Sequence, residues 1–348
     1  MIRELTISGL KNIKYEKMAL KPLTLLTGLN STGKSSVLQA ILLVNKATTK
    51  SGQLFLSHLL SSFSTLRNIY ENAKEIEIRL DIDGVVVEYK LSEKEEGENV
   101  EGCAGLEIEK NLFYLSANRV GAENSVALSP VITCGVDGNY LLGTFEREKS
   151  KSLTSALIKD ENSFTLAAQL NYWQSYILGL KLELKTEKRN EQTVEVKYNS
   201  DNIPGILPTQ LGAGVSYLAK VLILCLRSNP GDVVMIENPE IHLHPAAQSR
   251  LGDFFAFIAN AGIQLIIETH CDHLINKLQY LVFKKAFDAE QAIIYYKKGI
   301  IDPFERIQLN KEGRFQTEFP SGFFDATLAE LLEMESVSYT HLTLPTIR

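Results

Sequence analysis

Strict alternation of apolar and polar residues marks the beginning of the chain. The opening segment IRELTISGLKN alternates like a half-buried strand, and KPLTLLTG is a short apolar strand that runs into a glycine. Residues 75–91 form two alternating runs around Asp83 and Gly84, a strong signal for a β-hairpin. KLELK and TVEVKY form a second alternating pair farther along. We therefore expect an antiparallel β portion near the N-terminus.

The third quarter of the chain shows apolar runs without a polar face. LGAGVSYLAKVLILCLRS predicts a buried helix, and GDVVMIE and IQLIIETH predict buried strands. Between these strands, a helix is expected to start near Pro245 and stop at Gly262, and Asp272 is expected to cap the next helix. Buried strands that alternate with helices indicate a mostly parallel sheet covered on both sides, so the predicted fold class is α/β.

The amino-acid composition limits the class of protein but does not indicate a function. The 348 residues are 45% hydrophobic and 22% charged, which is ordinary for a globular protein. No run of about 18 apolar residues and no secretory leader occurs, so a cytoplasmic protein without a membrane partner is expected. The net charge of -6 argues against an obligate nucleic-acid coat and leaves a local basic groove possible. Four scattered cysteines favour neither a zinc site nor a disulfide framework.

The segment GLNSTGKSS carries the clearest chemistry. It lies between an apolar strand and a predicted helix, and it has the G-x-x-x-x-G-K-[ST] spacing of a P-loop. Its glycines let backbone N–H groups curl around phosphates, Lys34 supplies a positive charge, and the Ser35 hydroxyl can bind magnesium. ATP and Mg²⁺ are therefore the predicted cofactors. The predicted nucleotide-binding residues are Gly28, Asn30, Ser31, Thr32, Gly33, Lys34, Ser35 and Ser36.

A second motif, VVMIENPEIHLHP, ends another buried strand. A P-loop enzyme needs a carboxylate there for the magnesium ion, and Glu237 is predicted for this role together with Ser35. Glu237 is one methylene longer than the usual aspartate, which suggests contact through a water. The next residue is Asn238, where dimeric ATPases carry a general-base glutamate. An amide cannot accept a proton from water, so either hydrolysis is slow or Glu240 supplies the base.

Three histidines follow these strands. His270 comes directly after IQLIIET, at the carboxyl end of a strand, where α/β sheets bind ligands. It can contact the γ-phosphate or the attacking water, so the predicted catalytic group is Glu240, Asn238 and His270. His242 and His244 have the spacing of an H-x-H zinc site, but no third ligand cluster is nearby.

With the P-loop, MIENPEIHLHP and IIETHCDHL in this order, the chain resembles the ABC-type ATPase heads of the RecF, SMC and OLD group. It is most similar to bacterial predicted AAA-family ATPases with a short C-terminal domain of unknown function. The resemblance covers essentially residues 1–335, including FYLSANRVG and FPSGFFDA. It implies an ATP-sandwich homodimer, a dimer-contact loop at His242 and His244, and a switch histidine at His270.

In that family each nucleotide also contacts a signature helix of the other protomer. The candidate here, LGAGVSYL, departs from the usual L-S-G-G-[QE] pattern, with Gly212 in the serine position and Ser216 as a candidate replacement hydroxyl. A glycine-rich helix start still offers N–H groups and a positive dipole end to a phosphate. The alternative is that its glycines only permit tight packing. Gln39 and Gln53 are both candidates for the Q-loop glutamine. The predicted signature residues are Leu211, Gly212, Gly214 and Ser216.

The expected organisation is one ATPase head over residues 1–299, with insertions at about 53–91 and 145–198 that form a lid. Residues 300–336 are expected to form a small C-terminal appendix that is truncated. The last twelve residues, VSYTHLTLPTIR, show no hydrophobic periodicity, helix-capping residue or turn motif, and they resemble translated read-through of a sequencing adaptor. Residues 337–348 are therefore left out of functional reasoning.

Three functions are compatible with these motifs. The leading one is an ATPase whose dimer closes on ATP and acts on a partner. The resemblance implies an output in DNA repair or antiphage defence, with a nuclease or toxin as partner. Asn238 motivates the second, an ATP-sensing module with little turnover. The third is a metal-dependent nuclease that uses His242, His244 and the neighbouring carboxylates. No basic recognition helix supports DNA binding.

Overall fold

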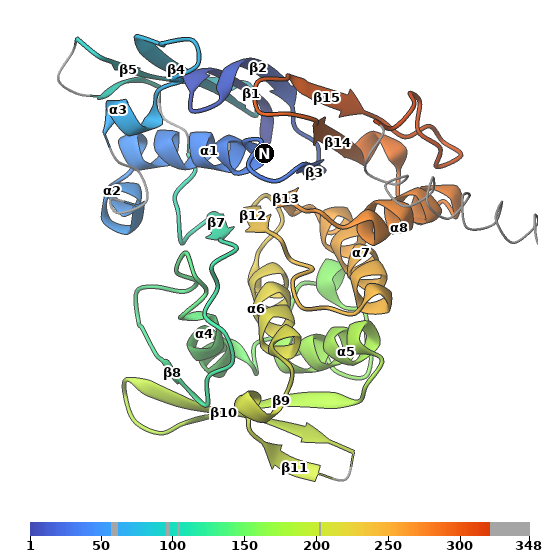
Figure 1. The fold of residues 1–348 in the computed structure, drawn as a ribbon. Coiled ribbons are helices and arrows are strands. Elements are labelled where there is room, and N and C mark those ends of the chain that lie inside the picture. The colour runs from blue at the N-terminus through green and yellow to red at the C-terminus, as the bar shows by residue number, and fades with distance from the viewer. Residues whose placement is uncertain (57–61, 95–97, 103–104, 202, 321–348) are drawn as a thin grey trace, which may run out of the picture.

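A six-stranded sheet lies at the centre of the protein (Figure 1). The computed structural model describes residues 1–56, 62–94, 98–102, 105–201 and 203–320. In the central sheet the spatial order is β15-β14-β3-β13-β12-β7, and only β14 and β15 pair antiparallel. Every residue of β3, β12 and β13 is buried, as apolar runs without a polar face predict. The strands are β3 Leu23–Gly28, β7 Leu112–Leu115, β12 Val233–Glu237, β13 Gln264–Glu268, β14 Ala292–Lys297 and β15 Phe304–Ile307.

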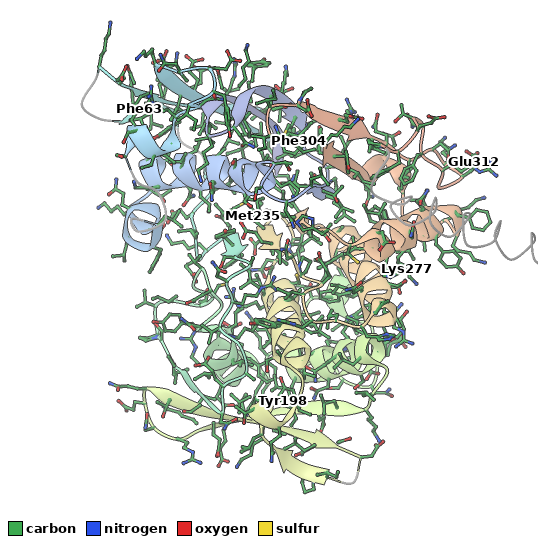
Figure 2. All side chains as sticks on the ribbon, in the orientation of Figure 1. Phe63, Tyr198, Met235, Lys277, Phe304 and Glu312 are labelled. Carbon is green, nitrogen blue, oxygen red and sulfur yellow. The ribbon has the colours of Figure 1, made fainter. Side chains whose placement is uncertain are left out.

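Alternate residues of the central strands enter two hydrophobic cores, one on each face of the sheet. In β12, Met235 belongs to the core around α1, Lys34–Thr48, whereas Ile236 belongs to the core around α6, Ala213–Arg227. Figure 2 shows Met235 near the middle of the molecule. Because side chains alternate along a strand, Glu237 at the end of β12 lies on the α1 side of the sheet.

An antiparallel sheet, ordered β2-β1-β4-β5-β6, covers the α1 core from the outside (Figure 1). The hairpin predicted at Asp83 and Gly84 is confirmed, because both residues have positive φ, 51° and 88°, as a two-residue turn requires. β4 pairs with β1, so residues 75–91, which belong to one of the two expected lid-like insertions, extend the N-terminal sheet. The strands are β1 Ile2–Leu10, β2 Ile13–Ala19, β4 Glu75–Ile82, β5 Val85–Ser92 and β6 Glu98–Glu101; short helices α2 Lys50–Leu56 and α3 Phe63–Leu66 follow α1.

The opposite face of the central sheet is covered by helices, with a small second antiparallel sheet beyond them (Figure 1). Within the expected insertion at 145–198, α5 packs on α6 and α7, and β9 pairs with β10. The elements are α4 Leu141–Glu148, α5 Leu166–Leu178, α7 Pro245–Asn260, α8 Asp272–Phe283, β8 Ser125–Ala127, β9 Leu182–Lys188, β10 Thr193–Ser200 and β11 Ile203–Ile206, with 3-10 turns at Ser155–Leu157, Pro208–Gln210 and Ala289–Gln291.

The end of the chain and the start of α8 differ from expectation. β15 belongs to the expected appendix, yet it pairs with β14 and so completes the central sheet. Residues 321–336 and the adaptor-like segment 337–348 lie outside the described residues. Asp272 is the first residue of α8 rather than its cap, and its carboxylate accepts a bond from the His273 N–H instead. Among the described residues, no helix is both long and apolar enough to cross a membrane.

Candidate functional site

The P-loop connects β3 to α1 and has the backbone that its glycines predict. Gly28 has φ 131°, and a Cβ there would lie 2.1 Å from the Lys297 carbonyl oxygen, so only glycine fits. Gly33, with φ 101°, is the N-cap of α1, and no side chain caps the helix. The amide of Asn12 donates to the Thr32 carbonyl and so holds the loop from the other side. Asn30 and Ser31 are exposed, whereas Thr32 and Ser36 are buried.

Lys34 is turned back over the loop. Its Nζ donates to the carbonyl oxygens of Gly28, at 3.2 Å, and Leu29, at 2.6 Å. Burial lowers the pKa of Lys34, and the charge of Glu268 acts against this shift. The ammonium group therefore lies between the loop that would hold phosphates and a buried carboxylate.

Two carboxylates end neighbouring strands beside Ser35. Glu237 and Glu268 are direct partners in the β12–β13 register, and they are 9% and 7% exposed. The hydroxyl of Tyr114 donates to Glu237 Oε1 at 2.8 Å, and the Ala117 N–H donates to Oε2 at 2.9 Å. Burial raises the pKa of Glu268 to about 7, whereas the nearby Ser35 hydroxyl favours the ionised form. Both carboxylates thus face the P-loop serine.

Glu240 and His270 also meet at this edge. The His270 N–H donates to Glu240 Oε1 at 2.9 Å, and Glu240 Oε2 is buried without a hydrogen-bond partner among the described residues. Burial raises the pKa of Glu240. Burial and, after it, the charge of Lys34 lower the pKa of His270, whose exposed imidazole lies near the Gly28 carbonyl. The P-loop, Glu237, Glu240 and His270 are therefore brought together, although they come from distant parts of the chain.

Arg119 is a site residue that the sequence analysis missed. It is 5% exposed, and its Nη2 donates to the carbonyl oxygens of Glu237 and, at 2.7 Å, Asn238. Burial lowers the pKa of Arg119 to about 10, and the charges of Glu240 and Glu237 act against this. Asn238 has φ 43°, and its N–H donates to the Glu268 carbonyl at 2.7 Å. Arg119 thus holds the turn that carries Asn238.

Glu268 was missed as well, although its signal was present in the sequence. It ends the strand IQLIIE beside His270, where carboxyl ends of parallel strands meet. The signal for Arg119 was weaker, because SANRVG reads only as a polar loop after a strand.

His242 and His244 do not form a metal site with their neighbours. His244 is the N-cap of α7, and its Nδ1 accepts from the Ala246 N–H at 3.3 Å. His242, with φ 61°, stacks its ring on Tyr217 at a centroid distance of 5.4 Å. In the described part of the chain, no group of three or more His, Cys, Asp or Glu side chains could hold a metal by itself. The H-x-H zinc site is thus not supported.

The four signature residues have different surroundings. Gly212 is exposed and caps α6, and a Cβ there would meet nothing within 4 Å. At Gly214 a Cβ would lie 2.4 Å from the His242 carbonyl oxygen, so tight packing explains that glycine. Ser216 is 2% exposed and lies near the Tyr198 hydroxyl, which corrects its expected role as a replacement hydroxyl. Leu211 packs against the α6 core.

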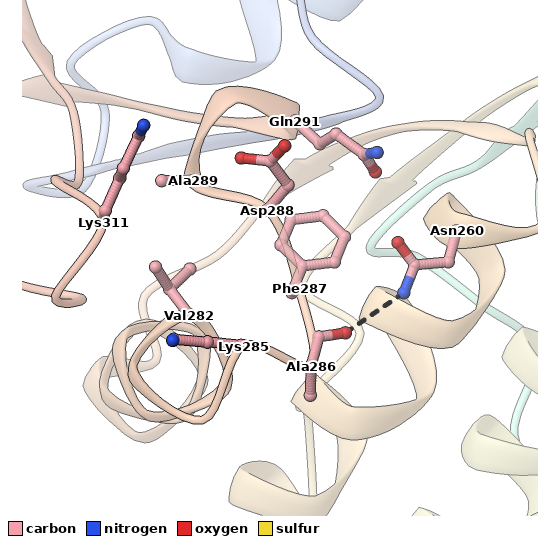
Figure 3. A pocket seen from close by; sticks show the side chains of 9 residues that line it. All are labelled: Asn260, Val282, Lys285, Ala286, Phe287, Asp288, Ala289, Gln291 and Lys311. Carbon is pink, nitrogen blue, oxygen red and sulfur yellow. Dashed lines mark hydrogen bonds between the residues drawn. The ribbon is translucent and has the colours of Figure 1, made fainter.

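Two clefts flank Ser35. One, of about 550 Å³, is also lined by Glu237, and the other, of about 450 Å³, is lined by Lys11 and Gly33. Gln39 lines both clefts, whereas Gln53 is exposed on α2 and lines neither. A further cavity of about 400 Å³, between α7 and the segment after α8, contains no predicted site residue (Figure 3).

Comparisons with known proteins agree with this architecture. Residues 139–276 match the family described as AAA domain, putative AbiEii toxin, Type IV TA system; the match covers less than half of the chain and starts after the P-loop. No curated protein matches the sequence. A crystal structure of an SMC head bound to the C-winged helix domain of ScpA is similar at 14% identity and a TM-score of 0.58, and covers 89% of this chain and 98% of that chain.

A second similar structure is an Smc head domain with an extended coiled coil, bound to the C-terminal domain of ScpA and derived from Pyrococcus furiosus. Its identity is 13% and its TM-score 0.57, and the match covers 96% of this chain and 99% of that chain. The predicted α/β P-loop fold and the resemblance to RecF/SMC-like heads are thereby confirmed.

Proposed function

We propose that this chain, which has the ABC-type ATPase head fold of RecF/SMC-like AAA proteins, binds ATP with magnesium and hydrolyses it. One observation carries this proposal. The loop with Lys34 and Ser35 lies beside the buried carboxylates at the ends of β12 and β13, and His270 follows directly. Phosphate-binding groups and candidate acid–base groups therefore share one edge of the sheet, as phosphoryl transfer to water requires.

Binding rests on the loop and on the start of α1. The uncapped N-terminus of α1 favours negative charge, and the positive φ values of Gly28 and Gly33 let the backbone curve around phosphate oxygens. Lys34 would exchange its carbonyl partners for phosphate oxygens. A magnesium ion bound with ATP supplies positive charge that stabilises the transferred phosphoryl group.

The donor set suits magnesium. Ser35 offers a hydroxyl, and Glu237 and Glu268 offer carboxylates, which are hard oxygen ligands. Magnesium in such sites is held by one or two carboxylates together with phosphates.

We assign the general base to Glu240. Its Oε1 is held by the His270 N–H, which leaves Oε2 free to accept a proton from water. Burial raises the pKa of Glu240 above its ordinary value, which makes the carboxylate a better proton acceptor near neutral pH. Asn238 stays in the usual base position and contributes only backbone contacts and an amide.

We further propose that ATP joins two copies of the chain. Gly212, the exposed N-cap of α6, is accessible to a second molecule, and the N–H groups and dipole at this helix end favour a phosphate. Gly212 has no packing reason to be glycine, unlike Gly214. The nucleotide of one protomer would then contact Gly212 of its partner. His242 and His244 would lie in the contact loop.

Closure of the dimer would act on a partner protein. The similar SMC heads are bound to domains of ScpA, and the matching family description names a putative toxin. Both support a protein partner for this chain. A nuclease or toxin in DNA repair or antiphage defence is the class that the sequence resemblance implies.

Asn238 favours a second candidate function, an ATP sensor with little turnover. Its amide cannot accept a proton, and its Oδ1 is buried without a partner among the described residues. If Glu240 does not serve as base, ATP would bind and close the dimer without rapid hydrolysis.

Phosphate release separates these functions. The ATPase proposal predicts turnover by the unaltered chain, none by Lys34→Ala, and a loss of about a hundredfold or more in Glu240→Gln. A rate for the unaltered chain equal to that of Lys34→Ala, with ATP binding retained, would favour the sensor. Full turnover by Glu240→Gln would exclude Glu240 as the base.

A further inference from the structure

The acidic residue at the end of β13 combines burial with free bonding capacity, as Glu240 does. Glu268 is 7% exposed, and its Oε2 has no hydrogen-bond partner among the described residues. Buried polar atoms are nearly always hydrogen-bonded, so a free carboxylate oxygen at the P-loop edge points to a ligand that is bound there. Its carboxylate lies beside the Ser35 hydroxyl and near the Lys34 ammonium group.

Glu237, its neighbour in the register, differs in this respect. Each oxygen of Glu237 already accepts one hydrogen bond, from Tyr114 and from the Ala117 N–H. These bonds fix the orientation of the Glu237 carboxylate. They leave Glu268 as the carboxylate with an uncommitted oxygen next to Ser35.

The charges around this pair also call for a cation. Glu237 and Glu268 are buried partners on neighbouring strands, and a negative charge on one increases the free energy needed to ionise the other. Lys11 lies near Glu237, and Lys34 lies near Glu268. The Nζ of Lys34 donates to carbonyls of the loop, and Arg119 donates to backbone carbonyls of β12 and the following turn. A divalent ion between Ser35 and Glu268 would neutralise the pair.

We propose that Glu268 at the end of β13, rather than Glu237 at the end of β12, is the carboxylate that binds the nucleotide's divalent ion directly with Ser35. Glu237 orients the site through Tyr114 and the backbone, and its contact to the ion runs through water. The inference rests on the proposed ATP binding and deepens it. It moves the metal-binding carboxylate to the last residue of β13, two positions before His270, so ion binding and the switch histidine share one backbone segment.

The test compares ATP affinity with Mg²⁺ and with EDTA in Glu268→Gln, Glu237→Gln and the exposed control Glu305→Gln. Glu268→Gln is expected to bind metal-free ATP no more weakly than the unaltered chain, because it removes a negative charge that faces the phosphates. Its gain in affinity on adding Mg²⁺ is expected to fall about ten- to a hundredfold. Glu237→Gln is expected to lose less, and Glu305→Gln nothing.

Mn²⁺ in place of Mg²⁺ gives a second readout, because the electron paramagnetic resonance spectrum reports the ion bound with ATP. The signal of bound Mn²⁺ should decrease in Glu268→Gln at concentrations that saturate the unaltered chain. An unchanged metal effect in Glu268→Gln, with a lost effect in Glu237→Gln, would overturn this inference alone. Absence of ATP binding by the unaltered chain would instead overturn the proposed function, and this inference with it.

Discussion

Gly212→Asp and Gly212→Ser separate the role of α6 in the dimer from its role in the fold. Gly212 has φ -61° and ψ 141°, which any residue can adopt, and a Cβ there meets nothing within 4 Å. Aspartate and serine are both preferred N-cap residues. Either is expected to stabilise the protomer by a few tenths of a kcal/mol relative to glycine.

The two variants should differ strongly once a nucleotide joins two protomers. The aspartate would place a negative charge where the partner's γ-phosphate is proposed to bind. Two unit charges about 4 Å apart repel by about 4 kcal/mol at an effective dielectric constant of about 20, and by about 1 kcal/mol in water. The symmetric dimer contains two such pairs, so the total of about 2 to 8 kcal/mol corresponds to a roughly thirtyfold to millionfold weaker dimer. Serine carries no charge and should dimerise at least as well as glycine.

Sedimentation velocity with a non-hydrolysable ATP analogue and Mg²⁺ measures this difference. The serine variant and the unaltered chain should form dimers at the same protein concentration, while the aspartate variant stays monomeric. Thermal unfolding without nucleotide checks that neither variant is less stable than the unaltered chain. Equal dimerisation by both variants would refute the proposed contact between α6 and a partner's nucleotide.

Three further predictions concern single residues. Arg119→Met should lower the free energy of unfolding by about 3 kcal/mol in urea titrations, because it leaves the buried carbonyl oxygens of the turn after β12 without their hydrogen-bond donor. A loss below about 1 kcal/mol would contradict this prediction. Gly28→Ala should abolish ATP binding, since its Cβ would clash with Lys297, whereas Gly205→Ala, which also has a positive φ but would meet no atom within 4 Å, should bind normally. Burial raises the pKa of Asp232 in the folded state, so folding favours the protonated carboxyl, and the stability that this group contributes is lost as pH rises through its folded-state pKa. Asp232→Asn should therefore melt at the same temperature as the unaltered chain below pH 3.8, the ordinary pKa of the group, and at a higher temperature at pH 7. Identical melting curves at pH 7 would refute this prediction.

Local patterns predicted the parts of this protein that depend on local backbone. The P-loop spacing requires glycines at Gly28 and Gly33, and both have the positive φ that the motif needs. The hairpin at Asp83 follows from its turn residues, and the central strands follow from apolar runs. Each of these features is decided by residues that are close in the sequence.

The rest of the site depends on contacts between distant segments, which a single sequence does not reveal. The bonds from Tyr114 to Glu237 and from Arg119 to the turn at Asn238 join residues more than a hundred positions apart. Which side chains an alternating or helical segment buries also depends on its neighbours. Ser216 illustrates this, because its place one turn into α6 directs it into the core rather than to a nucleotide.

Calorimetric titration of the chain with ATP and Mg²⁺ tests the central claim most directly. The unaltered protein should bind ATP with one site per protomer. Lys34→Ala should bind about a hundredfold more weakly, because charged hydrogen bonds worth about 3 kcal/mol are lost, while the exposed control Lys151→Ala should bind normally. Equal affinity of Lys34→Ala and the unaltered chain, or no binding by either, would contradict an ATP site at the loop between β3 and α1.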